Sequence, residues 1–491
     1  MSIRFLRNAG SSAQPYKKIK LHNKILGETM TSRLARMCVL LCTLPAANAL
    51  AGTIPPNQDV ATTLASPPTL IDVPPLKAAA QRLDQHGIRI DLNYVDDFIA
   101  NPGSGIIENQ TGNLGLFGIN ADFNLEKIIG LKGATIHEAT TVYGLRSNSH
   151  MLTNQGSMLG TINYLKYHSP VVLNMLTYEQ KIGRLDFEVG RSNVLRYFWR
   201  QNCDNPFNCE PALMAGDTPL MPLRYASWSG LARYQVTRAW YLQAGGFEDN
   251  AYNLNTNGLH FSTNHSTGTL GVGEFGYTTT FKTAAFPAHY EFGLWGDTTP
   301  HTNPYLSALG RPVQIYTKDP KASEPDPIGM FAEGRQVVWV GARQHAVGAQ
   351  PKNIALTWGL FAPLNGGQNF DLEAWLGGIF TGVIPGRPYD HFGFRVHYLQ
   401  LGSDFAHSET VARILAGGNA DPQPRNEYSF EVSYDIHLAP GVMLAPTAQY
   451  LINQDTYYFP KTRIAPRNGF VVSAFLVISL DHMLGLPAPR L

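Results

Sequence analysis

Charged residues are scarce in this chain. Asp, Glu, Lys and Arg make up 15% of its 491 residues, against about 25% in ordinary soluble proteins. An excess of one sign is missing as well, because 38 basic residues face 37 acidic ones. Without a basic field, the composition argues against a nucleic-acid partner. The hydrophobic share of 44% excludes a disordered chain, which would combine low hydrophobicity with high charge.

Long hydrophobic runs are also missing. The longest one, Met37–Ala47, falls short of the about 20 apolar residues that a membrane-spanning helix requires. Glycine is plentiful, with 46 residues, and aromatic residues reach 11%. The composition therefore favours a β-rich protein with few charges and many aromatic side chains.

The N-terminal segment has the order of a secretory signal. Arg33 and Arg36 precede the apolar stretch Met37–Leu44, and Ala49-Leu50-Ala51 follows as a small-residue cleavage site. This order indicates an exported protein rather than a membrane anchor. Signals usually begin near a methionine, and Met30 fits that position, so residues 1–29 are expected to be a non-structural leader. The alternative is a short buried strand.

Cysteine is rare, with four residues in the chain. Two of them lie in the signal, which leaves Cys203 and Cys209 in the exported part. In an oxidising compartment such a pair predicts a local disulfide. The alternative, a metal pair, lacks neighbouring Cys or His residues that would complete a tetrahedral site. No cofactor is expected.

Four regions are expected along the chain. The Pro-rich stretch Pro55–Pro75 has the composition of an extended linker, and Leu76–Gln85 is predicted to form a short helix that stops at Gly87. The predicted boundaries are 1–51 for leader and signal, 52–86 for linker and short periplasmic helix, 87–481 for a β-barrel, and 482–491 for a C-terminal tail.

From residue 88 onward, apolar and polar side chains alternate with a period of two. The clearest case is Glu427–His437, where Tyr428, Phe430 and Val432 alternate with acidic and serine residues. A soluble sheet would turn its apolar face to a core and its polar face to water. A membrane barrel would turn the apolar face to lipid and the polar face to its lumen. Alternation alone does not decide between these two folds.

The number and spacing of the segments favour the barrel. An even number of strands, sixteen, is predicted, and most have the about 9–11 residues that a tilted membrane strand requires. Their predicted ranges are 88–100, 113–125, 134–144, 171–181, 184–191, 227–237, 240–248, 269–278, 288–297, 335–346, 353–363, 369–381, 390–402, 426–438, 441–452 and 468–480.

The links between these segments tend to alternate in length. Ile182–Gly183 and Ala439–Pro440 are short, whereas Ser192–Ala226, Thr298–Gly334 and Ser403–Arg425 are long. Short turns at one rim and long loops at the other are typical of outer-membrane barrels. Every backbone polar group in hydrocarbon must be paired, so without a spanning helix a closed barrel is the remaining solution. Sixteen strands enclose an aqueous channel.

Six stretches resemble the carbohydrate-selective porin (OprB) family of bacterial outer membranes. Each one is a strand with its turn, and their common order covers roughly 370 residues, which makes the resemblance specific. The stretches are Leu83–Gly105, Leu125–His137, Tyr178–Val194, Trp240–Asn250, Phe380–Tyr398 and Tyr428–Asn453.

The resemblance implies an all-β protein, a closed antiparallel transmembrane β-barrel of about 16 strands. It also implies a passive channel for monosaccharides and similar small polar solutes, embedded in outer-membrane lipid, usually trimeric, and inserted by the barrel assembly machinery. One departure is the C-terminus. Barrels of this type usually end on an aromatic residue, whereas this chain ends with Leu486–Leu491. Either a short tail follows the barrel, or the assembly signal is internal, around Phe470–Leu480.

The long link Ser192–Ala226 is the predicted constriction. It carries Arg196, Trp199 and Arg200, followed by Cys203 and Cys209. Charged side chains can replace the water hydrogen bonds of a sugar, aromatic rings can stack on its apolar faces, and a disulfide would stiffen the loop. The alternative is an external loop that packs on a neighbouring subunit, because exposed aromatic residues also mark interfaces.

Alternation also predicts charged side chains on the pore wall. Each one alone is more simply a solvated charge that keeps the pore wet. As a set, opposed Arg and acidic residues would create a transverse field, although a single β-bulge would turn a side chain to the other face. The predicted wall residues are Arg89, Asp91, Glu179, Asp186, Glu188, Arg191, Glu291, Asp371, Glu373, Arg395 and Glu431.

Enzyme motifs lack their structural context. Gly271-x-Gly273-x-x-Gly276 matches a dinucleotide fingerprint in letters, but a β-prone segment follows it instead of a helix. An enzyme is therefore not expected. Two other functions stay open: a less selective or ion-preferring porin, and a secreted, soluble β-rich carbohydrate-binding protein.

Overall fold

The structure is a computed structural model. It describes residues 71–147, 150–160, 169–200, 210–220, 222, 224–346, 348–365, 369–487 and 489. The predicted signal, most of the Pro-rich linker and the pair Cys203 and Cys209 lie outside the described residues. The described part belongs to one compact unit, Ile54–Leu491.

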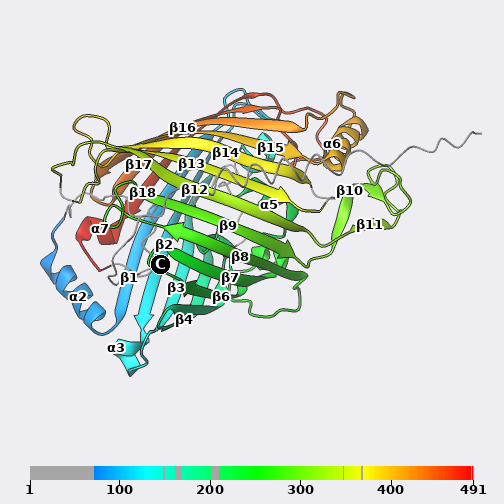
Figure 1. Ribbon diagram of the computed structural model, residues 1–491. Helices are drawn as coiled ribbons and strands as arrows, with labels where there is room; N and C mark the ends of the chain where they lie inside the picture. Colours follow the sequence, from blue (N-terminus) through cyan, green and yellow to red (C-terminus); the bar gives the residue numbers. More distant parts are fainter. Residues whose placement is uncertain are drawn as a thin grey trace, which may run out of the picture. The chain divides into compact units, whose positions relative to one another are not determined.

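Sixteen antiparallel strands close into a barrel (Figure 1). Each strand pairs with its neighbour in the sequence, except that β12 follows β9 in the wall, and β18 closes the barrel on β1. The barrel strands are β1 (Ile88–Ala100), β2 (Thr111–Asn124), β3 (Ala134–Ser147), β4 (Val171–Ile182), β5 (Leu185–Ser192), β6 (Ser227–Gln235), β7 (Trp240–Asp249), β8 (Gly268–Thr278), β9 (Ala288–Asp297), β12 (Ile328–Val340), β13 (Asn353–Pro363), β14 (Phe370–Thr381), β15 (His391–Leu401), β16 (Asn426–Ala439), β17 (Val442–Ile452) and β18 (Gly469–Ser479).

The two rims of the barrel differ. One rim, the turn rim, has short links such as Gly183–Arg184 and Pro440–Gly441, in which Gly183 and Gly441 adopt φ of 61° and 72°. Two-residue hairpins favour glycine because it adopts positive φ without steric cost. The helices α2 (Pro74–Gln85), α3 (Leu125–Ile129) and α7 (Leu480–Leu484) lie at this rim.

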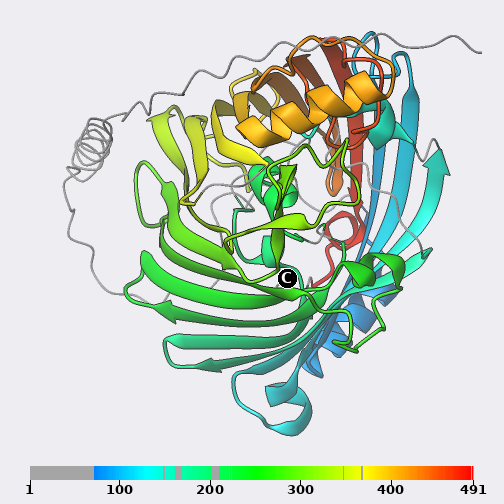
Figure 2. The same ribbon diagram turned by 90° about the vertical axis from the view of Figure 1, so that its right-hand side faces the viewer.

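The opposite rim, the loop rim, has the long connections. Its elements include α6 (Ser403–Leu415) and a separate hairpin of β10 (His301–Ser307) and β11 (Lys321–Glu324). Figure 2 faces this rim and shows further segments inside the ring of strands. The remaining short elements are α4 (Met151–Gln155), η1 (Val194–Arg196), α5 (Ala212–Asp217) and η3 (Ala251–Asn255).

The predicted barrel is confirmed, with one strand misplaced. The predicted range 335–346 corresponds to β12, which begins seven residues earlier, at Ile328. The first half of β12 resembles a loop in composition because it is rich in small residues. Gly334 leaves room for the rings of Tyr290 and Trp358, which would meet a Cβ at this position. The other fifteen predicted ranges agree with the strands to within three residues at either end.

The alternating side chains of the strands face as predicted, with apolar residues outward and polar residues inward. On β16 the outward Phe430 and Val432 are both 46% exposed, whereas the inward Glu431 is 1% exposed. The outward apolar side chains include Ile90, Leu92, Phe187, Val189, Leu294, Leu376, Phe394 and Phe470. Within the described residues, none of the helices has the length and apolarity to cross a membrane.

Candidate functional site

The segment after β5 returns into the barrel. We call residues 193–200 and 210–220 the inner loop. Its Phe198 and Trp199 have no exposed surface, and Gln243 on the inner face of β7 donates to the Tyr197 carbonyl (2.8 Å). This part of the predicted constriction therefore lies against the inside of the barrel wall. The alternative prediction, an external loop packed on a neighbouring subunit, is not what these residues form.

An aromatic row on the inner wall receives the inner loop. Phe331 and Phe361 stack at 5.7 Å between centroids, and Phe361 and Trp375 stack at the same distance. Trp199 packs edge-on against Phe331 at 5.8 Å and Phe361 at 6.1 Å. Trp199 has φ of 60°, an unusual value for a bulky residue, and tight packing on all sides compensates the strain.

Helix α5 of the inner loop is held by carboxylates. The Leu213 amide donates to Glu373 Oε2 (2.8 Å), and Glu373 Oε1 lies 2.8 Å from His397 Nε2. Asp217 accepts from the amide of Asn369 (2.7 Å). Glu373 was predicted as a charged residue of the pore wall. It faces inward as predicted, but both of its oxygens are occupied by protein groups.

Burial raises the pKa of the Asp217 carboxyl well above the ordinary value of an aspartic acid. Between about pH 4 and the raised pKa, Asp217 is therefore protonated when the inner loop is folded and deprotonated when the loop is released. Stability is lost as the pH rises through this window, because the folded state holds more protons.

We expect α5 to be held more tightly at pH 5 than at pH 8. Asp217→Asn should remove this dependence, because asparagine keeps an oxygen acceptor but does not titrate. Hydrogen exchange of the α5 amides, corrected for the intrinsic pH effect, measures the difference. Asp319→Asn in the exposed β10–β11 hairpin serves as control, and an Asp217→Asn profile identical to that of the unmodified protein would contradict the prediction.

The predicted wall residues divide by exposure. The buried ones on the inner wall, none more than 7% exposed, hold protein groups. Arg395 pairs with Glu431 (2.9 Å), and Glu179 accepts from Lys181 (2.6 Å). The buried set comprises Glu179, Glu291, Glu373, Arg395 and Glu431.

Arg191 is also buried, but it does not lie on the inner wall: it pairs in register with Leu176 and Trp228, which are both 38% exposed on the outward face. It donates to the carbonyls of His260 and Ala226 (2.9 and 2.6 Å). The prediction was wrong for Arg191, because this residue has the parity of the outward Val189.

The partly exposed set lies on β1 and β5 and on the inner loop. It comprises Arg89, Asp91, Asp186, Glu188, Arg196 and Arg200. Glu188 accepts from the hydroxyls of Tyr197 and Thr177, both at 2.6 Å, and Arg196 donates to Asn174 (3.3 Å). Burial lowers the pKa of the Arg196 guanidinium, and the positive charges of Arg224 and Arg200 add to this effect. Arg196 of the inner loop thus lies near the acidic Glu188 of the wall.

Asp371 does not lie on the inner wall. A register shift between β14 and β15 falls at Phe370 and Leu372, so that Phe370 and Glu373 are both buried on the inner side. The side chain of Asp371 is 45% exposed and pairs with Arg425, which is 41% exposed. The prediction was wrong here because a bulge inserts one residue and reverses the alternation.

Several inward residues escaped the sequence analysis. Glu333 lay in the stretch taken for a loop, and Gln449 binds Glu431 (3.0 Å) from β17. Asp217 is in no strand, so alternation offers no signal for it. Within the described part of the chain, no group of three or more His, Cys, Asp or Glu is placed to hold a metal ion.

Three matches among known proteins describe what this chain is similar to. A family model described as "Carbohydrate-selective porin, OprB family" matches residues 108–472. Porin B of Pseudomonas aeruginosa is 22% identical over 387 residues, which cover 75% of this chain and 83% of that protein. The high-pH structure of Pseudomonas putida OprB covers 85% of this chain and 99% of its own, with a TM-score of 0.71 and 20% identity.

Proposed function

Because this chain belongs to the carbohydrate-selective porin (OprB) family and is an outer-membrane channel for sugars, we propose a path for the solute. Monosaccharide-sized solutes pass between the inner loop and the wall formed by β1 to β6. The observation that carries the proposal is the exposure of the inward charges. Arg89 and Asp91 of β1 and Asp186 and Glu188 of β5 are partly exposed, whereas Glu291, Glu373, Arg395 and Glu431 of β9, β14, β15 and β16 are buried.

The residues along this path suit a neutral, hydroxyl-rich solute. Arg196 of the inner loop lies near Glu188 of β5, so that a donor and an acceptor stand on opposite sides of the path. A sugar hydroxyl both donates and accepts, and it can exchange its water hydrogen bonds for bonds to both sides. Protein groups hold most of these charges in place, which keeps binding weak enough for release.

The proposed path can be tested by electrophysiology. Single-channel conductance in a planar bilayer is expected to fall in steps when glucose is added. A channel with strong ion preference and no block by glucose would instead be the less selective porin. If glucose blocks the channel but substitutions of the partly exposed residues do not change this block, the path lies elsewhere in the barrel.

Replacing Glu188 by glutamine should shift the ion preference toward anions. The change removes one negative charge opposite Arg196, and a unit charge about 10 Å away contributes about 1.7 kcal/mol at an effective dielectric constant of ~20. The anion-to-cation permeability ratio is then expected to rise by about tenfold or more. The reversal potential in a salt gradient measures this ratio. Asp319→Asn removes an acidic charge from the outer hairpin and should change it little, and an unaltered ratio in Glu188→Gln would argue against the path.

Trimeric assembly, lipid contact and insertion by the barrel assembly machinery remain predictions of the family. One feature of the outward face supports close subunit contact. Gly230, Gly246, Gly271 and Gly296 are paired in one row across β6, β7, β8 and β9. A row without side chains lets a neighbouring chain approach the sheet closely. By the rule that short turns face the periplasm, the turn rim is the periplasmic end of the proposed path.

A further inference from the structure

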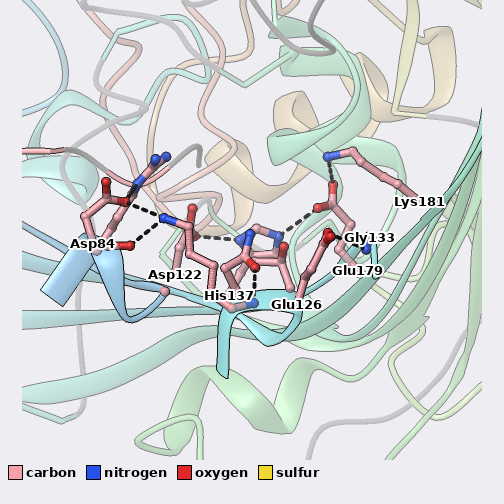
Figure 3. A pocket seen from close by; sticks show the side chains of 12 residues that line it. Asp84, Asp122, Glu126, Gly133, His137, Glu179 and Lys181 are labelled. Carbon is pink, nitrogen blue, oxygen red and sulfur yellow. Dashed lines mark hydrogen bonds and ion pairs between the residues drawn. The ribbon is translucent and has the colours of Figure 1, made fainter. Parts of the chain in front are cut away.

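A pocket lies at the turn rim, where α2 and α3 meet the ends of β1 to β4 (Figure 3). Its volume is about 240 Å³. The strands contribute Arg89, Asp122, His137, Glu179 and Lys181, and α2 contributes Asp84. This pocket is separate from the inner loop, because none of the loop's described residues (193–200 and 210–220) lines it.

Hydrogen bonds across three strands fix the wall of the pocket. His137 Nδ1 lies 2.7 Å from Asp122 Oδ1, and its Nε2 lies 3.5 Å from Glu179 Oε2. Lys181 Nζ donates to the other oxygen of Glu179 (2.6 Å). The side chains of Asp122, His137 and Glu179 are at most 9% exposed. Such a network holds its groups in one arrangement, so the polar wall is formed before any solute enters.

Helix α2 closes one side of the pocket through ion pairs. Arg89 Nε donates to Asp84 Oδ1 (2.6 Å), and Lys127 Nζ donates to the Asp84 carbonyl (2.5 Å). The hydrogen bond and charge of Arg89 lower the pKa of Asp84 below its ordinary value, which keeps the pair ionised at neutral pH. The two Nη groups of Arg89 make no hydrogen bond to any described residue, so donors remain available at this side.

The charges of the pocket favour an uncharged ligand. Four acidic residues in its lining stand against three basic residues and His137. The acidic groups named above already have a partner within the lining. An ion would gain little binding free energy from a wall whose positive and negative charges nearly balance. A polyhydroxylated solute, in contrast, can bridge donors and acceptors without a charge of its own.

Size and shape point to a single sugar ring. Drug-sized ligands occupy pockets of about 300–1,000 Å³, and this pocket is smaller. Among its described lining residues there is no Phe, Tyr or Trp, so stacking does not contribute and binding is weak. Weak binding suits a position from which a solute leaves into the periplasm, because transport requires release as well as entry.

We propose that this pocket is a second solute position, at the periplasmic exit, which holds one neutral sugar of monosaccharide size. The proposal rests on the proposed function, since the sugar must first pass the inner loop. The solute would bind through its hydroxyls to Arg89, Lys181 and the carboxylates that face the pocket. Helix α2, at the turn rim, would complete the site.

Side-specific block by glucose tests the proposal. In channels of known orientation, current noise gives the association rate constant of glucose. It is measured once with glucose added to the turn-rim side and once with glucose added to the loop-rim side. Lys181→Met and Glu179→Gln should weaken association from the turn-rim side at least threefold and leave block from the loop-rim side unchanged. Lys181 is 30% exposed, so its variant disturbs packing little and remains informative if Glu179→Gln assembles poorly.

The matched control is Arg387→Gln. Arg387 pairs with Asp390 (2.6 Å) in the turn between β14 and β15, outside the pocket, and its loss should leave glucose association unchanged from both sides. If both pocket variants retain normal association from the turn-rim side while block from the loop-rim side persists, the exit position is wrong. Stronger block from the turn-rim side by glucose 6-phosphate than by glucose would contradict the proposal that the ligand is neutral. Absence of block from either side in the unmodified protein would contradict the proposed function itself.

Discussion

Replacing Trp199 by alanine is expected to raise single-channel conductance and to abolish most of the block by glucose. Trp199 has no exposed surface, and it packs edge-on against Phe331 and Phe361 of the wall. Truncation of a buried tryptophan costs about 3–5 kcal/mol. The barrel strands pair independently of this contact, so the lost free energy weakens the attachment of the inner loop and not the barrel. A detached loop no longer narrows the channel.

Conductance and glucose block in planar bilayers measure the effect, and a heat-dependent gel shift shows that the barrel has formed. Trp228→Ala is the matched control, because Trp228 lies on the outward face of β6 and is 38% exposed. Its conductance should equal that of the unmodified protein. If Trp199→Ala also keeps its original conductance and block, the inner loop is not the element that narrows the channel.

A second large effect is expected at the ion pair of Arg395 and Glu431 on β15 and β16. The pair spans 2.9 Å, with the side chains 4% and 0% exposed. Removal of one partner leaves a buried charge without its counter-ion, which costs about 3–5 kcal/mol. Glu431→Ala should therefore lower the free energy of unfolding by that amount. Ser429 and Gln449, which also bind Glu431 (both 3.0 Å), would lose an acceptor.

The double variant Arg395→Met, Glu431→Ala separates charge from packing. Without the uncompensated guanidinium, most of the lost stability should return, because replacing both members of a buried pair is often neutral. Urea unfolding of the barrel in detergent or vesicles measures the three free energies. A double variant that is no more stable than Glu431→Ala would show that the hydrogen bonds of Glu431, rather than the charge of Arg395, dominate.

Alternation along the chain was a reliable guide to the wall. Phe430 and Val432 face outward and Glu431 faces inward, as their positions in the sequence predict. Two local features broke this rule. The glycine-rich start of β12 resembled a loop because its small residues make room for rings on neighbouring strands. The bulge beside Asp371 moved that carboxylate to the exposed side.

The roles of the charged residues were harder to predict than their direction. Glu373 and Glu431 both face inward, yet Glu373 holds α5 and His397, and Glu431 holds Arg395. Their partners come from segments that are far away along the chain, such as Leu213. A sequence pattern with a period of two gives the face of a side chain but not the loop that covers it. Solute contact for Arg89, Asp91, Asp186, Glu188, Arg196 and Arg200 therefore stays a prediction.

The sequence by itself determined the barrel, most of its strands and, for most of them, the face that points outward. These properties follow from local rules: backbone groups in hydrocarbon must pair, and side chains on a strand alternate between two faces. The tertiary structure decided which part of the lumen stays open. The inner loop packs on the aromatic row of β12, β13 and β14, and α2 closes a pocket at the turn rim. Both depend on contacts between distant segments, which local periodicity does not encode.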